Sequence, residues 1–339
     1  MSASTKPFSI NILLLLVSIF FTLVLCEGLL RLIGFQPWTP HKSRVNEPVM
    51  LEYDPVLGWR NKQGSFFLPR YDPSGKDAKL TFLDHGRRIT KRSSSNGKDQ
   101  IIFVGGSYTQ GWALNDEDTF AWKVQEQFPN FDVLNYGTGG YGTYQSLLLL
   151  EKELPLLSAP KHVFYGFIFH HEVRNTASGR WLRQLTEYSS RGHVALPFGS
   201  LNHQNTLQRN PPARYLKLPF RESLALVAFI ERAYMKLTSW SRFNDRSEIT
   251  EQILLEMKRV VEAYGASLTV AILTSSDEPK AHYLKFLRNN GIRGIDCVVP
   301  CTDCLYDLPR EMMIPGDGHP NAELNSMWAG CIAKSLQDE

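Results

Sequence analysis

The chain has 339 residues, with 37 Lys and Arg against 34 Asp and Glu, and 43% of its residues are hydrophobic. These values are typical of a globular protein and exclude disordered, collagen-like and coiled-coil chains. The formal net charge of +3 provides no basic footprint for a nucleic acid, so we expect no nucleic-acid partner. The whole-chain composition conceals one uncharged, strongly apolar segment near the start of the chain.

No charged residue occurs from Phe8 to Cys26. A helix of about 19 residues is roughly 28 Å long, close to the hydrocarbon thickness of a bilayer. The apolar run is longer than that of a secretory signal peptide, and no small-x-small cleavage site follows it. A large residue, Leu25, precedes the cysteine, which disfavours a lipoprotein. We therefore expect residues 8–26 to form a membrane anchor and residues 27–35 to form an amphipathic stem. The alternative is that the apolar run is a buried helix of a soluble protein.

The charges that flank this segment do not favour a cytoplasmic N-terminus. Lys6 precedes the apolar run, whereas Arg31, Lys42 and Arg44 follow it. The positive-inside rule would require the opposite bias.

Four cysteines lie in the last fifty residues: Cys297, Cys301, Cys304 and Cys331. They permit one or two disulfides, with three possible full connectivities. The first three also match the spacing of the iron–sulfur triplet in radical-SAM enzymes, and a zinc site is a further alternative. We expect disulfides or structural thiols and no metal, and disulfides would favour an extracytoplasmic domain.

Residues 36–97 are rich in Pro, Gly, Arg and Ser, with an expected strand at 79–83 and a solvated loop at 91–98. Strand and helix patterns then alternate, which predicts an α/β domain with a parallel five-stranded sheet covered on both faces. About eighty residues with little strand signal, apart from an expected helix at 222–239, predict an insertion at 172–245 that acts as a lid or specificity element. The expected strands are 100–104, 131–135, 162–168, 268–273 and 294–299, and the expected helices are 117–128, 144–154, 246–264, 279–290 and 320–337.

The first informative strand end reads Phe103-Val-Gly-Gly-Ser-Tyr-Thr109. Gly105 and Gly106 permit a sharp turn, which places Ser107 at the carboxyl edge of the sheet just before a helix. Reactive groups of open parallel sheets gather at this edge. The alternative is that Ser107 is a plain helix N-cap.

The second strand end reads Asn135-Tyr-Gly-Thr-Gly-Gly-Tyr-Gly142. Backbone N–H groups in such a loop can bind an anion. Its glycines also fit the Gly-x-Gly-x-x-Gly dinucleotide fingerprint, which makes nucleotide binding an alternative. The acidic residue expected about twenty positions later is missing, because the next strand ends in His170-His171-Glu172.

The third strand end is the loop Pro315-Gly-Asp-Gly-His-Pro-Asn321. A carboxylate as close as Asp317 can hold the His319 imidazole through one nitrogen, so that the other nitrogen can take a proton from a nucleophile. The alternative is a turn and helix entry without chemistry.

Together these blocks resemble the SGNH (GDSL-like) hydrolase superfamily, in particular its membrane-anchored bacterial members, over roughly residues 50–335. The resemblance implies a flavodoxin-like three-layer sandwich and esterase or O-acyltransferase chemistry on acylated sugars or lipids. It implies that Ser107 is the nucleophile, His319 the general base and Asp317 its orienting acid. The Ser107 and Gly140 amides would bind the oxyanion, and no cofactor or metal is required.

Three positions depart from the family pattern. Gly106 stands where the Gly-Asp-Ser form has an acid, and Asp317 is one residue closer to His319 than usual. The third block lacks its oxyanion-hole asparagine, so His170 is expected to take that place, with Asn175 as a second candidate. Thr109 separately excludes the α/β-hydrolase elbow, which needs glycine there.

The sequence therefore predicts an anchor and stem at 1–35, an extended, β-rich region at 36–97, and a hydrolase domain at 98–339. The expected function is that of a serine esterase or O-acyltransferase on acyl, especially acetyl, esters of glycans or lipids. We expect one pass through a bacterial inner membrane and a periplasmic or extracytoplasmic soluble domain. The alternative function is a non-catalytic, membrane-tethered carbohydrate-binding or assembly protein on the same scaffold.

Overall fold

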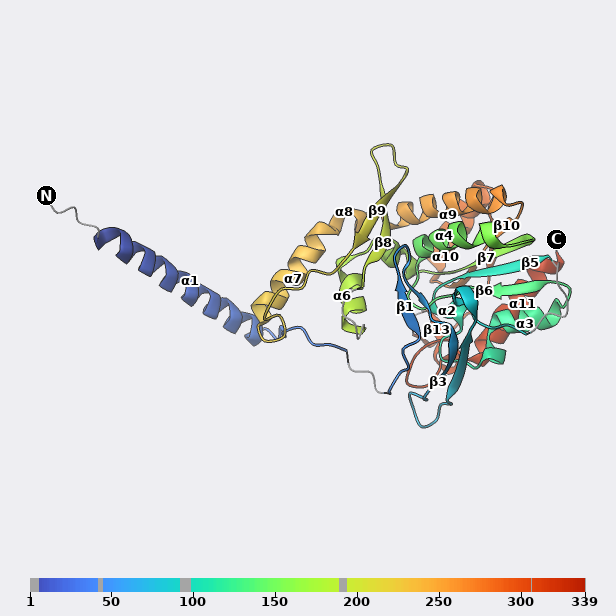
Figure 1. The fold of residues 1–339 in the computed structure, drawn as a ribbon, viewed down its shortest axis with the longest axis horizontal. Helices are drawn as coiled ribbons and strands as arrows, with labels where there is room; N and C mark the ends of the chain where they lie inside the picture. The colour runs from blue at the N-terminus through green and yellow to red at the C-terminus, as the bar shows by residue number, and fades with distance from the viewer. Residues whose placement is uncertain (1–5, 42–44, 92–98, 189–193, 306, 339) are drawn as a thin grey trace. The chain divides into compact units, whose positions relative to one another are not determined.

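The computed structural model describes residues 6–41, 45–91, 99–188, 194–305 and 307–338 (Figure 1). Its contacts divide the chain into two compact units. The first comprises residues 1–42, 178–194 and 214–240, and the second comprises residues 43–177, 195–213 and 241–339. Residues 92–98 of the expected loop, together with Lys42 and Arg44, lie outside the described residues.

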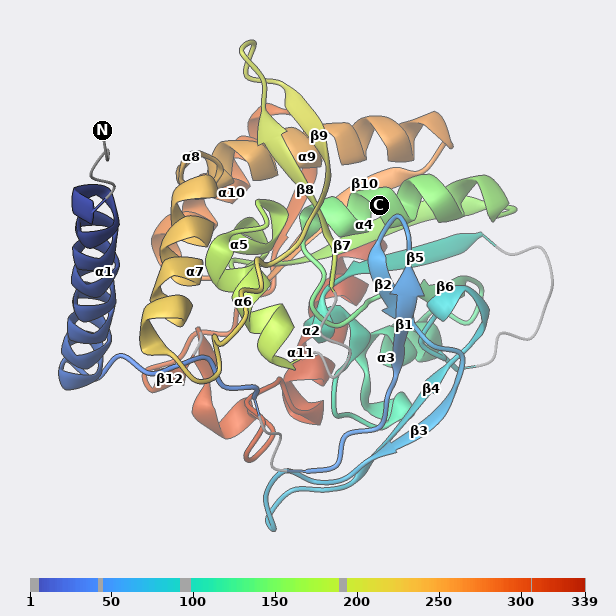
Figure 2. The same ribbon diagram turned by 60° about the vertical axis from the view of Figure 1, so that its left-hand side comes forward.

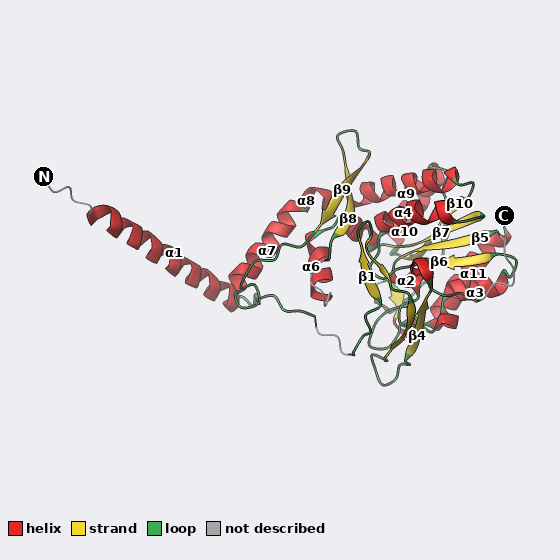
Figure 3. Cartoon of the chain, viewed as in Figure 1, coloured by secondary structure: helices red, strands yellow, loops and turns green. Residues whose placement is uncertain are grey.

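The second unit contains a five-stranded parallel sheet with the order β6-β5-β7-β10-β11. Figure 3 shows β6, β5, β7 and β10 side by side in this order. In chain order this is 2-1-3-4-5, the flavodoxin-like arrangement, in which ligands bind beyond the carboxyl ends of the strands. The predicted fold class is therefore confirmed. The strands are β5 (Gln100–Gly105), β6 (Asp132–Asn135), β7 (Pro160–Ile168), β10 (Ser267–Thr274) and β11 (Arg293–Asp296).

Helices cover both faces of this sheet, because every central strand is apolar on both sides. Figure 1 shows α4 and α9 on one face and α3 and α11 on the other, and each pair is in contact. Phe103 of β5 packs against Phe120 of α3, which in turn contacts Trp328 of α11. The helices are α3 (Phe120–Gln127), α4 (Thr143–Glu153), α9 (Arg246–Ala263), α10 (Asp277–Asn289) and α11 (Ala322–Gln337).

Two hairpins precede the sheet: β1 (Leu51–Asp54) with β2 (Gly58–Asn61), and β3 (Gly64–Leu68) with β4 (Ala78–Phe82). A further hairpin, β8 (Leu196–Leu201) with β9 (Leu207–Ala213), lies where the sequence showed little strand signal. Strand β9 contains Pro211 and Pro212, which donate no ladder hydrogen bonds and are tolerated only at a sheet edge. Strand β9 contains no buried residue, so it lacks the apolar run that marks a buried strand.

The first unit contains α1 (Lys6–Leu32), α6 (Gly179–Tyr188) and α7 (Ala225–Thr238). Within the described residues, one helical segment, Ile10–Leu32, is long and apolar enough to cross a membrane, with a mean hydropathy of 2.6 and no burial. A signal sequence near the N-terminus would have the same properties. In Figure 2, as in Figure 1, α7 begins beside the C-terminal end of α1.

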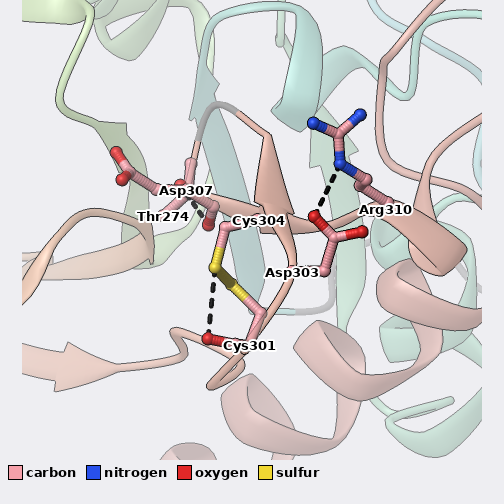
Figure 4. Close-up of a disulfide and its surroundings, with 6 residues drawn as sticks. All are labelled: Thr274, Cys301, Asp303, Cys304, Asp307 and Arg310. Carbon is pink, nitrogen blue, oxygen red and sulfur yellow. Dashed lines mark hydrogen bonds and ion pairs between the residues drawn. A yellow bond between two sulfur atoms is a disulfide. The ribbon is translucent and has the colours of Figure 1, made fainter.

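The four C-terminal cysteines form two disulfides, Cys297–Cys331 and Cys301–Cys304. Sulfur atoms joined in this way cannot act as the thiolate ligands of zinc or of an iron–sulfur cluster, so the disulfide alternative holds. Figure 4 shows the Cys301–Cys304 turn, which is flanked by an ion pair between Asp303 and Arg310. The longer disulfide closes the segment that carries Asp317 and His319.

We expect replacement of both Cys297 and Cys331 by serine to lower the free energy of unfolding by about 2–4 kcal/mol, because the unfolded chain gains the freedom of a long loop. The two cysteines are 34 residues apart, whereas Cys301 and Cys304 are 3 apart. Urea unfolding of the full chain in detergent, without reductant, measures the loss. The matched control replaces Cys301 and Cys304 and should lose less; a larger loss in the control would contradict the prediction.

Candidate active site

The turn after β5 places Ser107 at the carboxyl edge of the sheet. Gly105 has a φ of +155°, which a residue with a side chain rarely adopts, and Gly106 occupies the N-cap of α2 (Ser107–Gln110). Ser107 is thus the first helical residue, and its hydroxyl does not cap the helix. The N-cap alternative is therefore wrong for Ser107.

The hydroxyl of Ser107 instead meets the imidazole of His319, from a loop 212 residues further along the chain. The distance between Ser107 Oγ and His319 Nε2 is 3.0 Å, and that between His319 Nδ1 and Asp317 Oδ2 is 2.6 Å. Gly316 and Gly318 have φ values of +78° and +91°, so the loop curls enough for the carboxylate to reach the ring two residues away. The short acid-x-His spacing thus brings these three side chains into one hydrogen-bonded chain.

The environment of Asp317 favours its ionised form. Burial opposes ionisation, but the charge of His319, hydrogen bonds from the His319 ring and backbone, and a bond from Trp112 hold the pKa of Asp317 below its usual range. Trp112 Nε1 lies 3.3 Å from Asp317 Oδ1. An anionic carboxylate at Nδ1 keeps a proton on that nitrogen, which leaves Nε2 free to accept one from Ser107.

The glycine-rich loop after β6 lies against the Ser107 turn. The Thr138 N–H donates to the Gly105 carbonyl at 3.0 Å, and a Cβ on Gly137 would lie 2.3 Å from the Gln110 nitrogen. Gly140 has a φ of +82°. Among the described residues, no acceptor is paired with the backbone N–H of Ser107 or Gly140. Both amides are therefore available to an oxyanion.

The same geometry argues against the dinucleotide alternative. Gly142 is the N-cap of α4, and a Cβ there would lie 2.6 Å from Asn175 Oδ1. That oxygen accepts from the Tyr144 N–H, so a side chain of the protein already caps the helix terminus where a phosphate would bind. The glycine spacing serves close packing within the chain.

The segment that contains His170 and Asn175 supplies no free side-chain amide. Asn175 is buried, and its Nδ2 donates to the hydroxyls of Thr143 and Thr250, which leaves no donor for a substrate. His170 lies at the start of α5 (His171–Asn175) with an exposed side chain. Its place in an oxyanion hole stays a prediction.

Arg174 is a residue that the sequence analysis missed. Its Nη1 donates to the Tyr141 carbonyl at 2.8 Å, and a Cβ on Gly106 would lie 3.0 Å from the same nitrogen and 2.8 Å from His171 Nε2. The volume that a side chain at position 106 would need is therefore filled by Arg174 and His171. Burial lowers the pKa of Arg174 to about 10, so the guanidinium stays charged at neutral pH beside the Ser107 turn. The sequence signal that could have found Arg174 is its position, four residues after His170, the residue expected to donate to the oxyanion.

A second missed residue, Arg88, holds the end of α2 in place. Its guanidinium is fully buried and pairs with Asp116 at 2.9 Å. It also donates to the carbonyls of Gly111 at 3.0 Å and Leu114 at 2.7 Å. Burial lowers the pKa of Arg88, against the opposing charge of Asp116.

Residues of the β1–β2 hairpin support the glycine-rich loop. Asn61 Nδ2 donates to the Gly137 carbonyl at 3.0 Å, and Trp59 Nε1 donates to the Gly139 carbonyl at 2.8 Å. The region expected only to be extended and β-rich therefore contributes directly to the geometry of the site. In the part of the chain that the structure describes, no group of His, Cys, Asp and Glu could hold a metal ion.

Comparison with known proteins gives no family model and no curated protein that matches the chain. Among solved structures, a GDSL-like lipase from Bacteroides thetaiotaomicron is 12% identical, with 73% of this chain and 92% of that chain covered and a TM-score of 0.40. TesA is 11% identical, with coverage of 71% and 99% and a TM-score of 0.42. The esterase EstA from Pseudoalteromonas sp. is 9% identical, with coverage of 71% and 98% and a TM-score of 0.41. The function is therefore argued from the side chains of the site itself.

We expect Arg88→Met to lower the free energy of unfolding by about 3–5 kcal/mol, because it leaves the Asp116 carboxylate buried without its partner. Denaturant unfolding followed by circular dichroism measures the loss. The matched control is Lys91→Met, which removes the exposed pair of Lys91 with Glu126 and should cost about 0–1 kcal/mol. Equal losses in the two variants would show that Arg88 is not the support described here.

Proposed function

We propose that this protein is a serine ester hydrolase of the SGNH type. One observation carries the proposal: Asp317, His319 and Ser107 form a continuous chain of hydrogen bonds at the carboxyl edge of a flavodoxin-like sheet. The resemblance of the three sequence blocks supports the same assignment.

In the proposed reaction, His319 Nε2 takes the proton of Ser107 as Oγ attacks the carbonyl carbon of an ester. The carbonyl π bond becomes an oxyanion, which then collapses and breaks the bond to the alcohol oxygen. His319 gives its proton to that oxygen, and an acyl-serine remains. Water then gives a proton to His319 as it attacks the acyl-serine carbonyl. The bond to Ser107 Oγ breaks, His319 returns the proton to Oγ, and the acid leaves. A sugar hydroxyl in place of water would make the same site an O-acyltransferase.

The amides of Ser107 and Gly140 are the proposed oxyanion donors, each worth about 3–4 kcal/mol in the transition state. Arg174 adds a partly buried positive charge beside Gly106, which favours the developing negative charge. His170 remains the residue predicted from the sequence as a third donor.

The proposed substrates are acyl, especially acetyl, esters of glycans or lipids. The side chain of His319 is 27% exposed, so an ester on a large molecule can reach the site from the surface. We infer that α1 anchors the protein in a membrane by a single pass, and the two disulfides favour an extracytoplasmic location.

We expect a fluorophosphonate probe to label the full-length protein covalently, and Ser107→Ala to abolish the labelling because no nucleophile remains. His319→Gln should slow labelling by at least about a hundredfold, since the general base is lost. The control Ser326→Ala removes an exposed hydroxyl of α11 and should label like the unmodified chain. A folded protein that the probe does not label would reject the enzyme and favour the non-catalytic binding protein.

We expect Arg174→Met to lower kcat for p-nitrophenyl acetate by about ten- to a hundredfold with little change in KM, because the charge acts on the transition state. Arg174→Lys keeps the charge and should restore part of the rate. Circular dichroism of both variants monitors folding. If the lysine variant is as slow as the methionine variant while both stay folded, the charge is not the cause.

A further inference from the structure

Helix α7 turns an apolar face outward. Its outer face is defined here as Phe229, Ile230, Tyr234, Leu237 and, directly after the helix, Trp240. These side chains are 44–75% exposed. The positions 230, 234 and 237 follow the spacing of one helical stripe.

The buried face of α7 combines three apolar residues with one carboxylate. Ala225, Ala228, Glu231 and Met235 are the buried residues of the helix, and the Glu231 carboxylate is fully buried. That carboxylate accepts from the Leu218 N–H and lies 3.7 Å from Arg221. A surface helix in water normally places polar side chains on its outer face. The outer face of α7 is therefore suited to an apolar environment.

Side-chain contacts fix the start of α7 to the end of α1. The Glu27 carboxylate accepts the N–H groups of Ala225 and Leu226 at 3.0 and 2.8 Å, which caps α7. Arg31 of α1 donates to the Ser223 carbonyl at 2.8 Å. Both partners from α1 lie in its last two turns, so α7 begins where the apolar helix ends.

A further contact extends along α7. The ring of Phe35, just after α1, packs against Phe229 with centroids 5.5 Å apart, and Arg232 lies over the Phe35 ring at 4.4 Å. The outer face is thus continuous with the exit of the proposed membrane span.

We propose that the outer face of α7 lies in the interfacial layer of the bilayer that holds α1, at the boundary between headgroups and acyl chains. This inference rests on the membrane anchor of the proposed function. The chemistry fits: Ile230 and Leu237 supply apolar area, whereas Tyr234 and Trp240 are the amphipathic rings found at membrane interfaces. Arg232 and Lys236 flank the stripe and can pair with lipid phosphates. A second attachment of this kind restricts how the first unit can tilt on the membrane.

Site-directed spin labelling in nanodiscs of phosphatidylcholine and phosphatidylglycerol tests the proposal. In a Cys26→Ser background, labels are placed at Ile230→Cys and Leu237→Cys, with Leu16→Cys in α1 as the membrane reference and Lys285→Cys in α10 as the aqueous reference. Collisions with oxygen report apolar surroundings, and collisions with a neutral nickel chelate report water. We expect the labels at 230 and 237 to show an oxygen-to-nickel ratio at least about threefold above that at 285, and below that at 16, because they lie at interfacial depth.

Three results would overturn the proposal, and they are distinguishable. Labels at 230 and 237 that match Lys285 while Leu16 reports hydrocarbon would place α7 in water and leave the anchor intact. A Leu16 label in water would remove the anchor, and the inference with it. Spin–spin broadening at 230 and 237 that disappears on dilution with unlabelled chain would show that a second copy covers the outer face.

Discussion

The geometry of the site depends on the buried guanidinium of Arg88. Helix α2 has only four residues, too few to be stable alone, and the carbonyls at its end need donors. Arg88 supplies a donor to the carbonyls of Gln110 at 3.3 Å and Gly111 at 3.0 Å, and Asp116 balances its charge. Its backbone N–H also donates to the Asn135 carbonyl at the end of β6. Arg88 therefore contacts both the turn that carries Ser107 and the strand that leads into the glycine-rich loop.

Close packing requires glycine at three positions around the Ser107 turn. The side chain of Thr109 fills the space between Gly105 and Gly166, since a Cβ on either glycine would lie 2.3 Å from its Oγ1. Beside it, a Cβ on Gly106 would lie 2.8 Å from His171 Nε2 and 3.0 Å from Arg174 Nη1. The absence of a side chain at position 106 is therefore what allows the Arg174 cation to lie beside the turn.

The sequence predicted the sheet because its buried strands are apolar runs, and Ser107 and the glycine-rich loop directly follow two of these strands. The loop that carries Asp317 and His319 does not directly follow a strand of the sheet, and its Asp-Gly-His-Pro-Asn block was the signal that found it. The sequence did not predict the hairpins β1–β2 and β8–β9, because β1 has one buried residue and β9 has none. Arg88, Asn61 and Arg174 were missed for a different reason. Their partners lie 20 to 80 residues away or in another loop, and nothing local separates a buried arginine from the exposed ones around it. The contacts also divide the expected insertion: residues 178–194 and 214–240 group with the N-terminal helix, whereas 195–213 belong to the sheet unit.

The position of His319 connects the proposed chemistry to the redox state of the compartment. His319 follows β11 by a long connection, and its carbonyl accepts from the Ile314 N–H at 2.7 Å, while Asn321 caps α11 directly after it. The Cys297–Cys331 disulfide ties α11 back to the end of β11, so the loop that carries the imidazole is closed at both ends. In a reducing compartment this closure would be lost, and the loop would gain conformational freedom in the unfolded chain. The disulfide therefore makes the stability of the segment that holds His319 within 3.0 Å of Ser107 Oγ depend on the redox state of its surroundings.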